Sequence, residues 1–307
     1  MTGKFISIDG GTSNTRISLI CDGAITDRIN LTGGARDGFE KRKLRECIEK
    51  LLVSNKLNAD EIETVLASGM LTSREGLCEI PYITAPAGLK EIHNAIVRKR
   101  MPEICEIPFS FIPGVKIPSR KLETADVMRG EETELMGLNV DITDSLVLLP
   151  GSHSKCITVS SDSKIVDFHT YLTGEMTHAI SKDTILSKTV NMKCEPDRKY
   201  LKIGYEYCAK KGINETLFKT RILDMIFKTD GNQSYGFFMG GLLYGEINRI
   251  ISFPQRRIVV AGKKELKYPT VFLLKEYSEK EIICVDDASA DNAPTMGLLK
   301  IYSYVGS

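Results

Sequence analysis

Residues 4–19 read KFISIDGGTSNTRISL, and a similar stretch returns at residues 145–159 as SLVLLPGSHSKCITV. In both stretches, runs rich in aliphatic and β-branched residues stand on either side of a turn made of glycine and hydroxyl residues. This pattern predicts a β-hairpin. We therefore expect two glycine-turn hairpins, called hairpin 1 and hairpin 2 below.

The two hairpins align at a constant offset of 141 residues. The offset places Gly151 on Gly10, Ser154 on Ser13, and the LTG at residues 172–174 on the LTG at residues 31–33. Two similar turns in matching context predict an internal duplication, in which each half of the chain begins with a hairpin.

Hairpin 1 has the chemistry of a site for phosphate and a divalent cation. Glycines let the backbone N–H groups of a turn approach an anion, because no Cβ stands in the way. Asp9 would repel a bare phosphate, but it fits if Mg²⁺ lies between them. A lone D-G-G-T is also ordinary hairpin chemistry, so this prediction depends on the repeat. It assigns Asp9 to the metal and Gly10, Gly11, Thr12 and Ser13 to nucleotide phosphates.

Hairpin 2 lacks the carboxylate, because the offset puts Pro150 where hairpin 1 has Asp9. Its hydroxyl groups and its lysine could hold phosphate oxygens directly. The histidine of this turn could donate to a phosphate or could be a structural hydrogen-bonding residue. The predicted phosphate-binding residues are Gly151, Ser152, His153, Ser154 and Lys155.

The composition excludes several classes of protein. The 307 residues are 42% hydrophobic, have a net charge of +1 and contain no apolar run long enough to span a bilayer. We therefore expect a soluble, cytoplasmic protein with no nucleic-acid or membrane partner. The eight cysteines are scattered, which argues against a disulfide framework or a zinc site. Walker-type and Rossmann glycine motifs are absent from the sequence.

Helical and β-rich runs alternate in both halves, which predicts a two-lobed α/β protein. We expect a first lobe at residues 1–142 and a second at residues 143–307, packed around a shared cleft. The periodicity predicts a helix over residues 88–100. It also predicts a final helix over residues 292–305, which has Pro294 in its first turn and could pack back on the first lobe.

Paired hairpins with an aspartate in the first are typical of the actin, Hsp70 and sugar kinase superfamily. Within it, the chain closely resembles the 2-dehydro-3-deoxygalactonokinase family, over nearly its whole length and in the family's order. VMRGEET and PGSHSK are much more specific than D-G-G-T. The matching segments are IDGGTSNTR, GM-x-x-S at residues 69–73 with Pro81-Tyr82, VMRGEETELMG, LPGSHSK, LTGEMTH, FFMGGLLYGEI and VVAG.

The resemblance implies an enzyme that uses Mg²⁺ and ATP to phosphorylate the C6 hydroxyl of 2-dehydro-3-deoxy-D-galactonate, a sugar acid, in galactonate breakdown. It also implies a fold of two ribonuclease H-like lobes around a nucleotide cleft. Closure of the lobes would exclude water from the transfer.

The resemblance places the catalytic base at the start of a helix in the first lobe. Arg129-Gly130-Glu131-Glu132 holds that place here. We predict Glu131 as the base, with Glu132 and Asp126 as alternatives. Adjacent glutamates at a helix start could also be simple partners of the helix dipole.

A cation should meet the carboxylate of the sugar acid, and the arginines in matching segments are Arg16, Arg74 and Arg129. Arg74 is the weakest of them, because it lies in a loop that could be an exposed turn. The predicted substrate-binding residues are Asn14, Arg16, Ser73 and Arg129.

Gly262 ends a predicted strand where superfamily members let adenine lie against the backbone, so we assign it to the nucleotide. Lys263 follows where a second glycine is usual, which leaves the adenine contacts open. Gly240 and Gly241 lie in a predicted apolar helix, where each glycine lowers helix stability by about 1 kcal/mol relative to alanine. A close approach of another helix or of the nucleotide would explain why glycines stand there.

Two other functions remain open. The same transfer could use another 2-keto-3-deoxy sugar acid or a neutral sugar as acceptor, or the chain could be a nucleotide-binding sensor on the same fold. A homodimer is the oligomeric state we expect, although no residue pattern fixes it.

Overall fold

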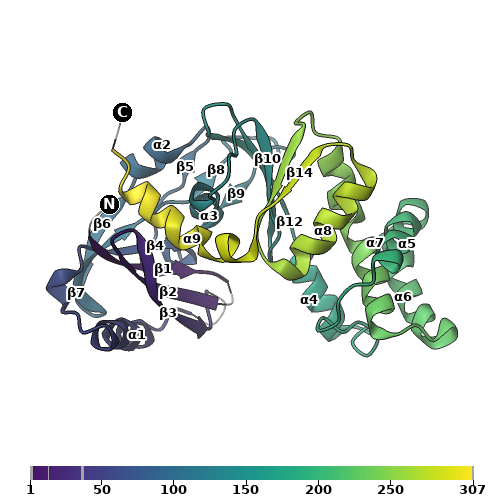
Figure 1. The fold of residues 1–307 in the computed structure, drawn as a ribbon, viewed down its shortest axis with the longest axis horizontal. Coiled ribbons are helices and arrows are strands. Elements are labelled where there is room, and N and C mark those ends of the chain that lie inside the picture. The colour runs from purple at the N-terminus through teal and green to yellow at the C-terminus, as the bar shows by residue number, and fades with distance from the viewer. Residues whose placement is uncertain (1–2, 13, 36–37, 306–307) are drawn as a thin grey trace. The chain divides into compact units, whose positions relative to one another are not determined.

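The computed structural model describes residues 3–12, 14–35 and 38–305. The chain divides into two compact units (Figure 1). Unit 1 contains Met1–Asp141, Asp162–Asp167 and Ala288–Ser307, and unit 2 contains Ile142–Ser161 and Phe168–Asp287. Both units are built on mixed β-sheets with helices, which confirms the predicted α/β class.

Unit 1 has a six-stranded sheet in the order β3-β2-β1-β4-β7-β6. Hairpin 1 supplies two neighbouring antiparallel strands, and β4 runs parallel to the first of them. The strands are β1 Lys4–Gly10, β2 Asn14–Cys21, β3 Ala24–Thr32, β4 Val65–Gly69, β6 Val97–Met101 and β7 Cys105–Phe111.

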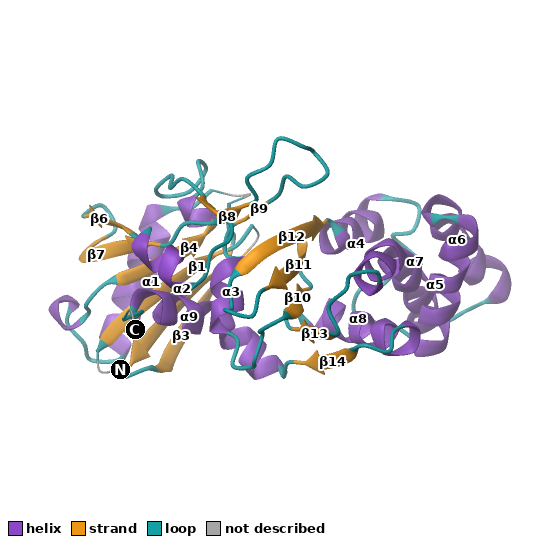
Figure 2. Cartoon of the chain, turned by 90° about the horizontal axis from the view of Figure 1, so that it is seen from above, coloured by secondary structure: helices purple, strands orange, loops and turns teal. Residues whose placement is uncertain are grey.

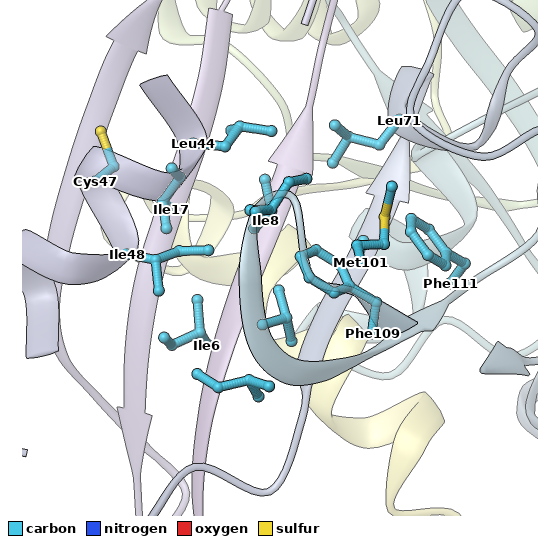
Figure 3. Close-up of a cluster of buried hydrophobic side chains, with 14 of the residues drawn as sticks. Ile6, Ile8, Ile17, Leu44, Cys47, Ile48, Leu71, Met101, Phe109 and Phe111 are labelled. Carbon is cyan, nitrogen blue, oxygen red and sulfur yellow. The ribbon is translucent and has the colours of Figure 1, made fainter. Parts of the chain in front are cut away.

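The two faces of this sheet differ in polarity because side chains alternate along each strand. On one face, Ile6, Ile8 and Ile17 pack with Leu44 and Ile48 of helix α1, Lys41–Ser54, in an apolar core (Figure 3). The other face carries the alternate residues of β1 and β2, several of which are polar. Its seryl groups, on Ser7 and Ser18, lie 3.5 Å from the Thr295 hydroxyl.

The predicted helix over residues 88–100 is wrong in its second half. Helix α2, Leu89–Asn94, is short, and Val97–Met101 forms β6. This strand pairs with β7, so tertiary ladder formation overrides the local helical pattern. Its charged, exposed middle, RKR, suits the edge of a sheet.

A smaller sheet in unit 1 leads into a short helix, α3, Glu131–Gly137. The sheet has the order β5-β8-β9, with strands Ile83–Thr84, Val115–Lys116 and Val127–Met128. Two 3₁₀ turns, η1 Ala59–Glu61 and η2 Met70–Thr72, flank β4.

The last helix, α9, spans Asp287–Tyr302, so it begins earlier than predicted. A carboxylate in the first turn favours this start, and Asp287 also accepts a hydrogen bond from Lys267. Pro294 therefore lies inside the helix and not in its first turn, where it removes one backbone hydrogen bond. In unit 1, α9 lies beside α3: a Cβ on Gly297 would stand 1.7 Å from the Thr133 carbonyl oxygen (Figure 1).

Unit 2 has a five-stranded sheet in the order β12-β11-β10-β13-β14. Hairpin 2 supplies β10, and β13 runs parallel to it as β4 does to β1. The strands are β10 Ser145–Leu149, β11 Ser154–Val159, β12 Ile165–Tyr171, β13 Arg257–Val260 and β14 Glu281–Cys284. The helices are α4 Thr173–Asp183, α5 Arg198–Lys211, α6 Ile213–Phe227, α7 Gly231–Ile251 and α8 Lys264–Tyr277.

The glycines of α7 make room for other helices, which is one of the two explanations that the sequence left open. A Cβ on Gly240 would lie 2.0 Å from the Leu201 carbonyl oxygen of α5, and a Cβ on Gly241 would lie 2.5 Å from Thr216 Cγ2 of α6. At Gly240 the backbones of two helices approach more closely than a side chain would permit, and at Gly241 the Thr216 side chain takes the space that a Cβ would need. Figure 2 shows α5, α6 and α7 side by side.

Strand pairing corrects the constant offset of 141 between the hairpins. A Cβ on Gly69, the last residue of β4, would meet the Gly10 carbonyl oxygen at 2.4 Å, and a Cβ on Gly262, just after β13, would meet that of Pro150 at 2.6 Å. Pro150 therefore corresponds to Gly10, an offset of 140 (150 less 10).

The turn of hairpin 2 is also one residue shorter. Asp9 pairs with Arg16 across hairpin 1, whereas Leu149 pairs with Lys155 across hairpin 2. Because the turns differ in length, no constant offset fits both strands. The counterpart of Asp9 is Leu149, which is buried, and not Pro150.

Candidate active site

The turn of hairpin 1 is in close contact with the backbone of the segment that follows β3. The Gly11 N–H donates to the Asn14 carbonyl at 2.9 Å, and the Ala35 N–H donates to the Gly11 carbonyl at 3.1 Å. A Cβ on Gly34 would lie 2.3 Å from that same Gly11 oxygen. The segment after β3 is therefore packed against Gly11 and Thr12. Ser13, the fourth predicted phosphate-binding residue of this turn, lies outside the described residues.

Asp9 stands at the end of β1, where β4 also ends. Register pairs it with Ser68, and a Cβ on Gly69 would lie 3.5 Å from Asp9 Oδ1. Gly69 has a φ of 70°, in the region that favours glycine. The carboxylate is therefore bordered on this side by glycine backbone.

The start of α3 lies beside these strand ends. A Cβ on Gly130, whose φ is 113°, would stand 3.2 Å from the Gly69 Cα. Glu131 follows Gly130 directly and is half-buried, and its Oε2 accepts a hydrogen bond from the Arg129 N–H at 2.9 Å. The fold thus brings together two sequence-predicted groups, Asp9 and the Glu131 segment, from positions far apart in the chain.

Glu132 is fully buried, unlike Glu131. Both of its carboxyl oxygens accept from the Gly130 N–H, at 2.9 and 2.8 Å. Desolvation and the neighbouring Glu131 raise the pKa of Glu132 to about 8, so this group is mainly protonated at pH 7. A protonated acid cannot accept the proton of an attacking hydroxyl.

Asp126, the other alternative base, lies before β9. Its Oδ1 accepts a hydrogen bond from the N–H of Val127, its exposed neighbour, at 2.7 Å. It belongs to the small sheet, since the Ile117 N–H donates to its carbonyl at 2.9 Å.

Arg129 ties the loop after β4 to the small sheet. Its Nη1 donates to the Thr72 carbonyl and hydroxyl, both at 2.6 Å, and its Nη2 donates to the Ile80 carbonyl at 3.2 Å. The guanidinium also stacks on the Tyr82 ring, 4.0 Å from its centroid. Its buried Nε has no hydrogen-bond partner among the residues that the structure describes.

The other predicted substrate-binding residues take different places. Asn14 is exposed at the first position of β2. Arg16 forms an ion pair with Asp291 of α9, with Nη2 3.0 Å from Oδ1. The Ser73 hydroxyl is buried and donates to the Met70 carbonyl at 2.8 Å, whereas Arg74 is exposed. Of this set, Arg16, Ser73 and Arg129 are engaged by other protein groups.

Hairpin 2 has a turn of the same construction in unit 2. A Cβ on Gly174 would lie 2.2 Å from the Gly151 carbonyl oxygen, as Gly34 does with Gly11 in hairpin 1. The Glu175 N–H donates to the Ser152 carbonyl at 3.0 Å. On the other side of the turn, Gly262, which has a φ of 80°, packs against the backbone of Pro150.

The side chains of hairpin 2 divide between the surface and the interior. His153 is half-exposed, and its Nε2 lies 2.8 Å from Glu175 Oε2. The Ser154 hydroxyl is buried within the turn, 3.4 Å from the Gly151 nitrogen. Lys155 is buried as well, and its Nζ donates to the Thr170 hydroxyl of β12 at 2.6 Å. His178 is exposed on α4.

Glu246 on α7 is a residue that sequence reasoning missed. Its carboxylate is buried and accepts a hydrogen bond from the Thr173 hydroxyl, one residue before Gly174. Burial raises the pKa of Glu246 to about 7. The available signal was an acidic residue in the apolar segment FFMGGLLYGEI, because a glutamate is rarely buried unless another group pairs with it.

The donors around Asp9 are compatible with Mg²⁺ but not with a closed metal cage. Within residues 3–12, 14–35 and 38–305, no three His, Cys, Asp or Glu side chains gather as a metal site. Mg²⁺ commonly binds through one or two carboxylates together with water and substrate phosphates, a pattern that a single aspartate can serve.

Within the described residues, no helix is both long and apolar enough to cross a membrane.

Comparison with known proteins gives a consistent result. A family model described as 2-keto-3-deoxy-galactonokinase matches residues 9–301. DgoK1 of Rhizobium meliloti (strain 1021), named as a probable 2-dehydro-3-deoxygalactonokinase, is 31% identical over 195 residues, 61% of this chain and 60% of the relative. The chain thus matches less than two thirds of that relative's length. The 2-dehydro-3-deoxygalactonokinase of Escherichia coli (strain K12) is 24% identical over 250 residues, 80% of this chain and 79% of the relative.

A solved structure shows the same fold. The crystal structure of a candidate 2-dehydro-3-deoxygalactonokinase from Sinorhizobium meliloti superimposes with a TM-score of 0.79 at 24% identity, covering 97% of both chains. The predicted actin-like ATPase and sugar kinase fold is confirmed.

Proposed function

Because the chain belongs to the 2-keto-3-deoxy-galactonokinase family, we propose that it transfers the γ-phosphoryl group of ATP to the C6 hydroxyl of 2-dehydro-3-deoxy-D-galactonate. One observation in unit 1 carries the proposal. The end of β1, with Asp9, the glycine that ends β4 and the start of α3, with Glu131, meet closely: a Cβ on Gly69 would lie 2.4 Å from the Gly10 carbonyl oxygen, and a Cβ on Gly130 would lie 3.2 Å from the Gly69 Cα. A metal-binding carboxylate and a candidate base thus stand on neighbouring rigid elements.

Phosphoryl transfer depends mostly on positioning and on neutralising charge. In this proposal Asp9 holds Mg²⁺, which when bound neutralises charge on the phosphates. The turn around Gly151 in unit 2, with its hydroxyl side chains and half-exposed His153, holds phosphate oxygens. ATP is the donor that a kinase of this fold would use.

Glu131 orients the attacking hydroxyl and accepts its proton. Its partial exposure supports this role, as does the protonated state of Glu132 at neutral pH. Asn14 is exposed beside the turn and is a direct candidate for contact with the sugar acid. Arg129 supports the site indirectly in this proposal, by holding the loop between Thr72 and Ile80.

A coupled assay of ADP release tests the proposal. The acceptors are 2-dehydro-3-deoxy-D-galactonate, its gluconate epimer and neutral hexoses, each with magnesium ATP. We expect turnover of the galactonate compound, reduced roughly 100-fold or more in Asp9→Ala and in Glu131→Gln. Glu134→Gln is the matched control, because Glu134 is a third acidic residue in the first turn of α3.

The results of this assay distinguish three errors: a wrong substrate, a wrong catalytic base, and carboxylates that act only on the dipole of α3. If ATP binds but no acceptor is turned over, the substrate assignment is wrong and a sensor function gains support. If Glu132→Gln is inactive while Glu131→Gln is active, the base assignment is wrong. Equal losses in Glu131→Gln and Glu134→Gln would show that these carboxylates act only on the helix dipole.

A further inference from the structure

Arg16 stands directly across hairpin 1 from Asp9. The strand register pairs the two residues between β1 and β2. Residues that stand opposite each other in an antiparallel pair share one face of the sheet, with Cβ atoms about 4.5–5.5 Å apart. An arginine at this distance can form an ion pair with the aspartate. Such a pair would compete with a divalent cation for the Asp9 carboxylate.

The Arg16 guanidinium is bound instead by Asp291 of α9. Its Nη1 donates to the Asp291 backbone carbonyl at 2.9 Å, and its Nη2 lies 3.0 Å from Asp291 Oδ1. Both contacts involve the same residue, so Asp291 determines where this guanidinium lies.

The packing of α9 on the sheet of unit 1 explains this contact. One turn further along α9, Thr295 lies 3.5 Å from the hydroxyls of Ser7 and Ser18, which pair across β1 and β2. Asp9 and Arg16 are the next residues on the same face of these strands. Four helical residues rise about 6 Å and two strand residues about 6.6 Å, so the two steps match. The helix therefore presents its carboxylate at the level of the Asp9–Arg16 pair.

Arg28 of β3 also holds the Asp291 carboxylate in place. Its Nη1 pairs with Asp291 Oδ2, and its Nη2 donates to Asn292 Oδ1 at 2.8 Å. Its Nε donates to the Ser18 hydroxyl at 3.1 Å. The two arginines thus share one carboxylate. Without that carboxylate, Arg28 would keep two of these contacts, whereas Arg16 would keep the one to a backbone carbonyl.

We propose that Asp291 is a positioning residue for the metal site, which keeps Arg16 from competing with Mg²⁺ for Asp9. This inference rests on the proposed function, in which Asp9 holds Mg²⁺. When the Asp291 carboxylate is removed, Arg16 can turn to Asp9, and Mg²⁺ must then displace a guanidinium. The side chains of Arg16 and Asp291 are 27% and 53% exposed, so water screens their ion pair and the effect is modest.

Calorimetric titration of the full chain with ATP, in excess Mg²⁺ and in EDTA, tests the proposal. The measured quantity is the ratio of the two dissociation constants, which is the factor by which Mg²⁺ tightens ATP binding. In Asp291→Ala we expect this ratio to fall roughly three- to tenfold. The affinity in EDTA should not fall, because no metal then has to reach Asp9. Asp291→Glu should keep most of the ratio, because it keeps a carboxylate.

Second-site variants separate the movement of Arg16 from general damage to unit 1. Arg16→Gln combined with Asp291→Ala should restore the ratio, because no guanidinium is left to occupy Asp9. Arg28→Gln combined with Asp291→Ala is the matched control. It should not restore the ratio, because Arg28 lies on β3, which does not neighbour β1 in the sheet.

A ratio that Asp291→Ala leaves unchanged, including equal weakening of ATP binding in both conditions, would overturn the proposal. A double variant with Arg16→Gln that fails to restore the ratio would overturn it too, as would a wild-type chain that binds ATP no better with Mg²⁺. Failure of the sugar acid to be phosphorylated would count against the proposed substrate alone, because these titrations contain no acceptor.

Discussion

Gly130 lies directly on Gly69: a Cβ on Gly130 would stand 3.2 Å from the Gly69 Cα. Both glycines have positive φ angles, 113° and 70°. Their contact joins the start of α3 to the end of β4, next to Asp9. The spacing between Asp9 and Glu131 therefore depends on two positions where a side chain would strain the backbone, and at Gly69 it would also clash with the Gly10 carbonyl oxygen.

Gly69→Ala should destabilise unit 1 and reduce activity. The new Cβ would lie 2.4 Å from the Gly10 carbonyl oxygen, and the positive φ adds strain of about 1–3 kcal/mol. We expect a loss of at least about 3 kcal/mol in the free energy of unfolding by urea. Gly38→Ala is the control, since Gly38 has a similar φ of 78° but a Cβ there would meet no atom of the described residues within 4 Å. Equal losses in both variants would mean that the Gly69 contact itself contributes nothing.

The difference in the free energy of unfolding between Glu132→Gln and wild type should shift in favour of the variant as the pH rises from 5 to 8. The pKa of Glu132 is raised from 4.5 to about 8 in the folded chain, so between these values the folded state holds a proton that the unfolded state has released. Stability of the wild type therefore falls with rising pH, by at most about 1.4 kcal/mol per pH unit from this group. Below pH 4.5 the effect vanishes, because both states are protonated.

Urea unfolding at pH 5, 6.5 and 8 measures this trend, with exposed Glu123→Gln as the control. A stability difference between Glu132→Gln and wild type that does not change with pH would contradict the burial argument.

Arg129→Lys should loosen the loop after β4. Lysine cannot reproduce the forked contacts to the Thr72 and Ile80 carbonyls or the stacking on Tyr82. We expect a loss of about 2–4 kcal/mol in the free energy of unfolding, together with a higher KM for the sugar acid. Arg74→Lys, at an exposed position in the same loop, should change neither value. If Arg129→Lys raises KM without loss of stability, Arg129 contacts the substrate directly.

Glu246→Gln should weaken ATP binding more than it slows turnover at saturation. Glu246 accepts from the Thr173 hydroxyl, next to the glycine that backs the Gly151 turn. Calorimetric titration with ATP should show a several-fold loss of affinity in Glu246→Gln and a larger one in Glu246→Ala. Thr173→Val should give no additional loss when combined with Glu246→Ala, because both remove one contact. Additive losses would show that the two residues act separately.

The alternation of apolar residues and the glycine turns were sufficient to predict both hairpins and the α/β class. The local sequence pattern predicted the wrong element or the wrong boundary where contacts with other parts of the chain determined the structure. Residues 97–101 join β7 as an edge strand, and α9 extends back to Asp287, where a carboxylate favours its start. The constant offset of 141 failed because the two turns differ in length by one residue.

By itself, the sequence determined which residue types stand in the two turns and at the start of α3, because glycine, hydroxyl and acidic residues have local preferences that are visible in order. Only the tertiary structure decided which of them are buried and what they touch. Glu131 and Glu132 are neighbours in the chain, yet one is half-exposed and the other is fully buried with a pKa near 8. Arg16 likewise meets Asp291, a residue far along the chain. Desolvation and ion pairing depend on segments brought together by folding, so no local pattern could assign them.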